Sequence, residues 1–379
     1  MAENMDLDKK VLSRILRFAR KARRPGDAPL QSIRAKEGGV GARTVKYDIV
    51  GENQVRQCFV RVTGNGVIEE EFPERFAHNA QVSMRMARDY RLYFECERPR
   101  SAPRPIAFAL LSPDGGIKPF PEMLPGTRVV EIFESDGGPT YEDMLTLYAE
   151  SQKGDGKIFD EKELKPIEAM AKAVAAIHKL GYRSLINKNY AHDQDRKRLL
   201  YEDHVETILQ MVFRHRKFGK HGTLERSAKD KILGLMTDIA EEYLDGSVDV
   251  SGRLWKLSGD FSESNILFYP DGQAYLCDES RFPYGERGTD LGWWSGHALW
   301  RKYAENNDSH AKRHRAFIGF YNQEIGEPDP LLPRFMCLGL CLLCFVKFNP
   351  VFRQKIEPER GKKFIEHVIS ILERRHFDF

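Results

Sequence analysis

The sequence has little net charge and no long apolar run, and both absences exclude broad classes of protein. The formal net charge is only +3 over 379 residues, whereas a dedicated nucleic-acid binder usually carries a strong basic excess. The longest apolar run, residues 335–346, is shorter than the roughly 20 residues that span a bilayer. Two basic stretches, Arg20–Arg24 and Arg214–Lys220, are interpreted as solvated helix faces or loops. We therefore predict that the partners include neither nucleic acid nor membrane.

A full metal-type set of cysteines is also lacking. Cys341 and Cys344 have C-x-x-C spacing, but no second such pair and no histidine cluster accompanies them, which argues against a zinc site. Cys337, Cys341 and Cys344 recur on one helical face, where thiols behave as small core hydrophobes. The N-terminal stretch has no apolar segment of the kind found in secretory signals. A reducing, cytoplasmic setting is the expectation.

The chain does contain enough apolar sequence for a large core, at 41% hydrophobic and 30% charged residues. Its first part contains an amphipathic helix at residues 7–21 and runs typical of strands, at 44–50, 58–63, 106–111 and 128–133. After residue 135 helical periodicity dominates, with helices expected at 163–180, 203–213, 224–244, 335–346 and 362–374. We predict an α+β protein with a small β-rich unit at residues 1–135 and a larger, mainly helical unit at residues 136–379.

The segment Ser258–Asp278 carries the most chemical information. Asp260 and Asn265 stand in a D-x-x-x-x-N spacing, and Pro270-Asp271-Gly272 predicts a hairpin whose second strand leads to Asp278. A carboxylate can orient a hydroxyl and accept its proton, while an amide oxygen and a second carboxylate suit Mg²⁺ as hard oxygen ligands. These are the groups that phosphoryl transfer to a hydroxyl needs.

This segment resembles the aminoglycoside phosphotransferase and choline kinase superfamily of eukaryotic-kinase-like enzymes. The family's loop reads H-G-D-x-x-x-x-N, followed by a hairpin, a metal-binding Asp and a further Asp in D-L/I-A/G, which Asp290-Leu291-Gly292 matches. The resemblance implies a bilobal protein-kinase-like fold and a small-molecule O-kinase that uses ATP and Mg²⁺. It implies that Asp260 is the catalytic base, that Asn265 and Asp278 hold Mg²⁺, and that Asp290 is structural.

The resemblance also suggests nucleotide-binding residues in the first unit. Gly39 and Gly41 lie between two expected strands, where the family has a loop over the phosphates; a plain hairpin turn is the alternative. Arg61, in V-R-V-T-G-N, occupies the place of a phosphate-binding strand residue, with an exposed strand arginine as the alternative. Glu131 and Phe133 fall in the stretch that resembles the hinge, whose backbone would meet adenine.

The acceptor is suggested only by a cluster of aromatic residues after Asp290. Trp293, Trp294 and Trp300 could cage a cationic amine through cation–π contacts, with Asp203 adding negative charge. On this interpretation the acceptor is a hydroxylated amine, such as an amino alcohol or an aminoglycoside-like compound. The alternative is that the rings anchor a core helix.

Two departures from the family pattern leave other functions open. Ser258 stands where the family has His, and no acidic partner for Arg61 is evident, with Gln81 and Glu74 nearest by rough alignment. A catalytically weak or inactive kinase-like nucleotide-binding protein is therefore one alternative. A protein kinase is another, although the segment between Asp278 and Asp290 is short and no A-P-E follows it.

Overall fold

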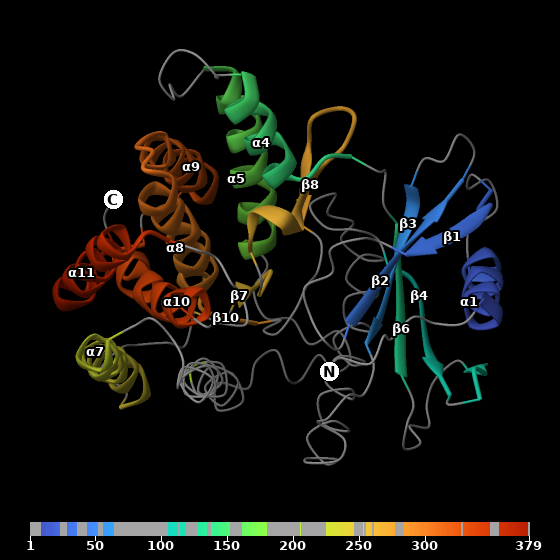
Figure 1. Cartoon of the computed structure of the whole chain (residues 1–379), viewed down its shortest axis with the longest axis horizontal. Coiled ribbons are helices and arrows are strands. Elements are labelled where there is room, and N and C mark those ends of the chain that lie inside the picture. Colours follow the sequence, from blue (N-terminus) through green and yellow to red (C-terminus); the bar gives the residue numbers. More distant parts are fainter. Residues whose placement is uncertain are drawn as a thin grey trace. The chain divides into compact units, whose positions relative to one another are not determined.

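The chain divides into two compact units, Met1–Gly138 and Pro139–Phe379, which we call the sheet unit and the helical unit (Figure 1). The division falls a few residues after the predicted boundary at 135/136. The computed structural model describes residues 9–22, 29–35, 44–51, 56–63, 105–112, 114–118, 128–134, 138–151, 161–179, 205, 225–245, 253, 255–259, 261–276, 284–326, 329–348 and 356–377.

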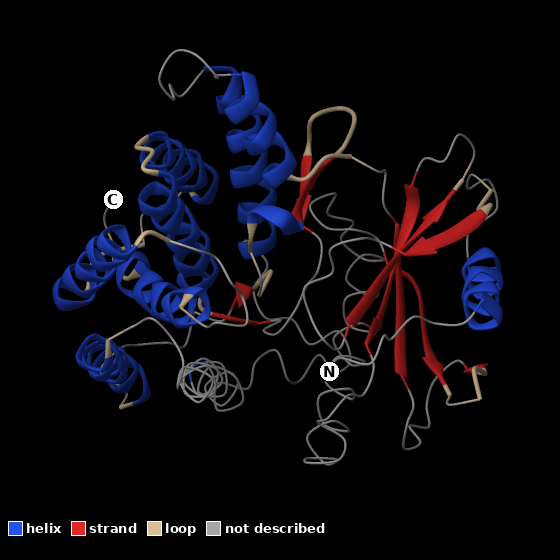
Figure 2. Ribbon diagram, in the orientation of Figure 1, coloured by secondary structure: helices blue, strands red, loops and turns tan. Residues whose placement is uncertain are grey.

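The sheet unit is built on one antiparallel six-stranded sheet in the order β1-β2-β3-β6-β4-β5 (Figure 2). Four of its strands coincide with the alternating or β-branched runs predicted from the sequence. The strands are β1 (Ser32–Ala35), β2 (Thr44–Val50), β3 (Arg56–Thr63), β4 (Pro105–Leu111), β5 (Ile117–Lys118) and β6 (Arg128–Glu134).

Helix α1 (Lys9–Ala22) covers one face of this sheet. Every second side chain of β3, namely Cys58, Val60 and Val62, is buried in a core shared with Ile15 and Ala19 of the helix. That alternation places Arg61 at a position belonging to the opposite face of β3. The predicted amphipathic helix and its role in covering a core are thus confirmed.

The helical unit contains the longer helices of the described chain. Its elements are α4 (Tyr141–Ser151), η2 (Glu161–Glu163), α5 (Leu164–His178), α7 (Arg226–Leu244), α8 (Arg287–Glu305), α9 (Ser309–Ile325), α10 (Leu332–Lys347) and α11 (Pro358–Arg374). The apolar run predicted as a buried helix lies in α10, whose residues from Phe335 to Phe345 are all buried. None of the helices in the described ranges combines the length and hydropathy needed to cross a bilayer.

Short strands lie between α7 and α8. β7 (Trp255–Lys256) pairs with β10 (Tyr284–Gly285), and β8 (Ile266–Phe268) pairs with β9 (Ala274–Leu276). The second pair is the predicted hairpin, closed by a hydrogen bond from Tyr269 N to Gln273 O at 2.8 Å. Gly272 has φ of +83° in its turn, a conformation that favours glycine. All but Val205 of the helix expected at 203–213 lies outside the described residues.

Candidate active site

The predicted catalytic loop runs from β7 to the hairpin. Ser258 and Gly259 follow β7, and Asn265 ends the short helix η5 (Glu263–Asn265), directly before β8. Asn265 is buried, and its backbone N–H donates to Ser262 O at 3.0 Å. Asp260 and Asp278 lie outside the described residues. The structure therefore describes the backbone before the predicted base and the residue predicted as the first metal ligand.

Asp290, in the first turn of α8, holds the start of this loop. Its carboxylate accepts hydrogen bonds from the backbone N–H groups of Ser258 at 2.7 Å and Gly259 at 3.0 Å. The Asp290 side chain is buried, so these two bonds also satisfy much of a charge that burial would otherwise penalise. Gly259 has φ of +76°, which lets the chain turn directly before Asp260. Asp290 thus fixes the backbone that leads into the predicted base.

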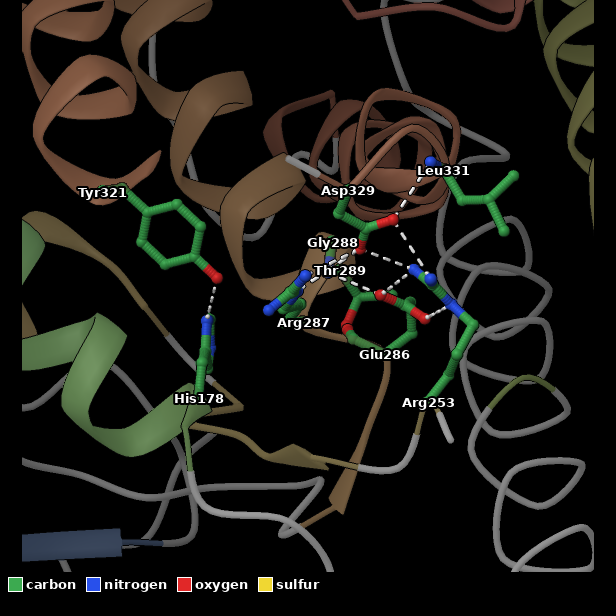
Figure 3. Close-up of polar contacts among 9 residues, drawn as sticks. All are labelled: His178, Arg253, Glu286, Arg287, Gly288, Thr289, Tyr321, Asp329 and Leu331. Atoms are coloured by element: carbon green, nitrogen blue, oxygen red, sulfur yellow. Dashed lines mark hydrogen bonds and ion pairs between the residues drawn. The ribbon is translucent and has the colours of Figure 1, made fainter. Parts of the chain in front are cut away.

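His178 supports the Asp290 carboxylate from the end of α5. Its Nε2 lies 3.2 Å from Asp290 Oδ2, and its Nδ1 lies 3.0 Å from the hydroxyl of Tyr321 on α9. The His178 side chain is fully buried. Figure 3 shows the imidazole and the Tyr321 hydroxyl pointing toward one another. This setting agrees with a structural His178 rather than one that reacts with substrate.

A second contact, between Glu263 of η5 and Arg301 of α8, holds the same loop. Glu263 is buried and accepts from Arg301 Nε at 2.5 Å, while Arg301 Nη1 donates to Glu305 at 2.8 Å. Arg301 also forms an ion pair with Glu142 of α4 at 3.3 Å. Sequence analysis did not identify Arg301. The only available signal was Glu263, an acidic residue inside D-x-x-x-x-N. That position does not identify which arginine of the chain pairs with it.

Four charged side chains fix the N-terminal end of α8, next to Asp290 (Figure 3). Arg253 donates to both carboxylate oxygens of Glu286, at 2.8 and 3.1 Å, and to both oxygens of Asp329. Arg287 donates to Asp329 Oδ2 at 3.0 Å. Burial raises the pKa of Glu286 to about 7, although the Arg253 guanidinium opposes that rise. The cluster ties the segment before β7 to the starts of α8 and α10, and so supports the position of Asp290.

The Trp255 ring lies under the same two arginines. The guanidinium carbon of Arg287 is 4.5 Å from the ring centroid and that of Arg253 is 5.0 Å away. Such cation–π contacts stabilise guanidinium groups that have lost part of their hydration. Trp255 therefore contributes to the cluster, a role that the sequence pattern did not suggest.

The predicted acceptor residues are only partly supported. Trp294 is 2% exposed and packs on Phe261 and Phe317, and Trp300 is 3% exposed and packs edge-on against Phe348 and Phe364. Rings enclosed in this way anchor α8 in the core and present no face to a ligand. We therefore correct the prediction for Trp294 and Trp300.

Trp293 differs from these two rings, because it is only partly buried. It shares one face of α8 with His297 and Arg301, at four-residue spacing, and Arg301 contacts the catalytic loop through Glu263. Trp293 therefore stays a candidate acceptor residue. Asp203 lies outside the described residues.

The predicted nucleotide-binding residues belong to the sheet unit. Arg61 lies on β3, in register with Lys46 of β2 and Glu131 of β6, while Phe133 is in register with Phe59. Gly39 and Gly41 lie outside the described residues. The strand register thus pairs the positions of Arg61 and Glu131, which sequence alignment alone did not suggest.

Among the described residues, no three or more histidine, cysteine, aspartate or glutamate side chains form a cluster suited to a metal ion. The predicted Mg²⁺ site draws on Asp278, which is not among them. The described partner, Asn265, precedes β8, and β8 pairs with β9 so that Ile266 faces Leu276. Because the chain reaches Asp278 two residues after Leu276, Asn265 and Asp278 flank the same end of the hairpin in sequence.

Two histidines, the buried His314 and the partly buried His297, predict how stability depends on pH. Burial lowers the pKa of His314 to about 3 and that of His297 well below its ordinary value of 6.5. Both are therefore neutral in the folded chain and take up protons only on unfolding. Below about pH 6.5 the unfolded state binds more protons, so the free energy of unfolding falls as the pH falls.

Between about pH 7.5 and about pH 5.5 we expect each of these histidines to contribute a loss of about 1.4 kcal/mol. Urea unfolding of the wild type and of His314→Gln at both pH values checks this. Between the two pH values, the free energy of unfolding of the variant should fall by about 1.4 kcal/mol less than that of the wild type. His376→Gln, at an exposed histidine, is the control for replacing histidine by glutamine. An identical pH dependence in wild type and His314→Gln would contradict the assignment.

Comparisons with solved structures give the fold. The chain is similar to an amicoumacin kinase in complex with AMP-PNP and Ca²⁺, with a TM-score of 0.53 and 12% identity over 98% of this chain and 96% of that one. It is also similar to choline kinase from Cryptosporidium parvum, with a TM-score of 0.51 and 12% identity over 96% and 95%. A third similar structure is a Plasmodium vivax ethanolamine kinase, with a TM-score of 0.50 and 13% identity. The match covers 99% of this chain and 93% of that one.

No protein-family model matches the sequence, and a comparison with curated protein sequences found no significant match. The structural similarity nevertheless extends over nearly the whole of each chain, and the three similar structures are, by name, kinases of small molecules. The comparisons therefore show the fold: the chain shares the α+β fold of these small-molecule kinases, as the sequence resemblance implied.

Proposed function

We propose that the chain transfers phosphate from ATP, with Mg²⁺, to a hydroxyl group of a small molecule. The observation that carries this proposal is the pair of hydrogen bonds from the Ser258 and Gly259 backbone amides to the Asp290 carboxylate, immediately before Asp260. Phosphoryl transfer depends mostly on positioning and electrostatics, and a buried carboxylate that holds the loop backbone supplies positioning. The fold shared with small-molecule kinases supports the same activity.

In this proposal Asp260 orients the acceptor hydroxyl and accepts its proton. Asn265 and Asp278 would hold Mg²⁺, which is suited to their oxygen atoms and would neutralise charge on the phosphates when bound. The buried setting of Asn265 at the head of the hairpin fits a ligand held in one orientation. Its neighbours Ser262 and Ser264, whose hydroxyl oxygens lie 3.3 Å apart, add polar groups to the same loop.

The sheet unit supplies the proposed contacts with the nucleotide. Arg61 would meet the phosphates as a permanently charged fork. Glu131, its register partner on β6, is the acidic residue that we propose as its support. The loop containing Gly39 and Gly41 would cover the phosphates. The backbone of Glu131 and Phe133, both in β6, would meet adenine.

For the acceptor we propose a hydroxylated amine. Two of the proteins similar in fold are named as a choline kinase and an ethanolamine kinase. Choline and ethanolamine are small amines with one hydroxyl group. Trp293 is the aromatic residue of the predicted cage that keeps an exposed surface, and an ammonium group over an indole gains about 0.5–2 kcal/mol.

Acceptor-dependent ADP release tests the function directly. The purified chain is incubated with ATP and Mg²⁺ and with separate pools of amino alcohols, aminoglycosides, nucleosides and sugars. We expect release with the amine pools. Nucleotide binding without release from any pool would favour the alternative of an inactive kinase-like protein, and release only with a protein acceptor would favour a protein kinase.

Replacement of Asp278 by alanine tests the metal site. We expect the affinity for ATP in the presence of Mg²⁺ to fall roughly tenfold, because a charged ligand is lost, while Mg²⁺-free affinity changes little. Isothermal titration calorimetry with and without the metal measures both values. Asp271→Ala, in the exposed hairpin turn, is the matched control. Equal losses with and without Mg²⁺ would mean that Asp278 is structural.

A further inference from the structure

A continuous chain of buried polar groups runs from α9 to the catalytic loop. The Tyr321 hydroxyl lies 3.0 Å from His178 Nδ1, and His178 Nε2 lies 3.2 Å from Asp290 Oδ2. Asp290 in turn accepts from the Ser258 and Gly259 backbone amides. Tyr321 is separated from His178 by 143 residues in sequence, so only the fold brings them together.

The hydrogen-bonding capacity of these groups selects one arrangement of protons. An ionised Asp290 has only acceptors, so the nitrogen that faces it, His178 Nε2, must carry a hydrogen. If His178 Nδ1 also carried a hydrogen, the Tyr321 hydroxyl would have to accept and its own hydrogen would have no acceptor. Among the described residues, His178 is the only hydrogen-bond partner of that hydroxyl. A neutral imidazole with its hydrogen on Nε2 satisfies all three groups.

The surroundings of Tyr321 favour the same arrangement. Its side chain is fully buried, next to Phe317, and its ring meets the His178 ring edge-on at 5.7 Å. Burial raises the pKa of Tyr321, against the nearby positive charge of Arg287. The phenol therefore keeps its hydrogen at neutral pH and is available as a donor.

We infer that Tyr321 is a positioning residue: by donating to Nδ1 it holds His178 in the Nε2–H tautomer, and through Asp290 it orients the loop that enters Asp260. This inference rests on the proposed function only for its effect on phosphate transfer. The tautomer itself is a property of the folded chain. Figure 3 shows the hydroxyl aimed at the ring nitrogen.

Removal of the hydroxyl leaves His178 Nδ1 buried without a donor. The Nδ1 lone pair is then unsatisfied, and a hydrogen gained there would find no acceptor. The ring can escape this cost only by leaving its position against Asp290. Such a shift disturbs the carboxylate that holds the Ser258 and Gly259 amides.

The first test is ¹⁵N NMR of the 379-residue chain labelled at histidine. His178 is assigned by the signals lost in His178→Gln. At neutral pH we expect the wild type to show one protonated nitrogen, Nε2, and one unprotonated nitrogen, Nδ1. A hydrogen on Nδ1 or on both nitrogens would overturn the inference without any Tyr321 variant, so this test does not depend on whether that variant folds.

The second test compares Tyr321→Phe with Tyr243→Phe. Tyr243 is also a buried tyrosine of the helical unit, but its hydroxyl has no hydrogen-bond partner among the described residues, which makes it a matched control. In Tyr321→Phe we expect the His178 signals to change and amide exchange at Ser258 and Gly259 to become faster. With an acceptor found by the screen, kcat should fall about tenfold, the scale of one buried hydrogen bond, with an unchanged KM for ATP.

Unchanged His178 signals, or equal effects of Tyr321→Phe and Tyr243→Phe on amide exchange, would overturn the inference. If the wild type releases no ADP with any acceptor, the proposed function fails. The NMR and exchange measurements still decide whether Tyr321 sets the tautomer and holds the loop.

Discussion

Replacement of Gly292 by alanine is expected to destabilise the protein by about 3 kcal/mol or more, through overpacking. A β-carbon at this position would lie 2.0 Å from the Met336 carbonyl oxygen and 2.7 Å from Met336 Cα, far inside ordinary contact. The obstacle is backbone, which cannot rotate away as a side chain can. Helices α8 and α10 would have to separate, and whole domains are stable by only about 5–15 kcal/mol.

The same close approach recurs along the interface. A β-carbon at Gly339 of α10 would lie 2.2 Å from Thr289 O, and one at Gly288 would lie 2.4 Å from Phe335 Cβ. Asp290 is positioned between these contacts on α8. Separation of the two helices is therefore also expected to displace Asp290 from the Ser258 and Gly259 amides.

Gly234→Ala is the matched control for this prediction. Gly234 lies in α7, is exposed, and has no atom within 4 Å of an added β-carbon. There alanine should stabilise the chain by about 0.5–1 kcal/mol, because glycine disfavours helix. Urea unfolding of both variants measures the difference. A Gly292→Ala variant that is as stable as Gly234→Ala would show that α8 and α10 do not approach this closely.

Much of the fold could be predicted because its signals are local. The α10 helix follows from an apolar run of helical length, and the β8–β9 hairpin follows from Pro270-Asp271-Gly272 between two strand-like runs. Strand β3 follows from the compact run at residues 58–63, which is rich in β-branched side chains. Each of these signals depends on neighbouring residues, so no knowledge of the tertiary contacts is required.

The contacts that position the candidate site could not be predicted, because they join residues far apart in sequence. Arg301 meets Glu263 across 38 residues, and Arg253 meets Asp329 across 76. Periodicity assigns a residue to a helix face but does not name its partner on another element. The role of Tyr321 was invisible for the same reason.

The tryptophan prediction failed in part for a different physical reason. A dense group of aromatic residues after the catalytic segment fits both a ligand cage and a core anchor. For Trp294 and Trp300 the deciding fact is enclosure by Phe317 and Phe364 on other helices. Composition and spacing do not contain that information, whereas packing does.

Replacement of Asp260 by asparagine is expected to lower kcat by a factor of about 100 or more, the usual scale for the loss of a positioned base. Asparagine keeps the shape and one oxygen, so acceptor and nucleotide can still bind, but it does not accept the hydroxyl proton. The backbone before it is held by Asp290 and should keep its position. The loss should therefore fall on kcat, with the KM for ATP and the thermal stability nearly unchanged.

Asp238→Asn makes the same chemical change at an exposed position of α7 and controls for the loss of a negative charge. ADP release is measured for wild type and both variants with the acceptor found by the screen, alongside melting temperature and ATP affinity. Turnover by Asp260→Asn near the wild-type rate would show that another group accepts the proton. A loss of kcat accompanied by an equal loss of stability would instead assign Asp260 a structural role. A large loss confined to kcat, with Asp238→Asn unaffected, is the result expected if Asp260 is the base that the Asp290-held loop presents to the acceptor.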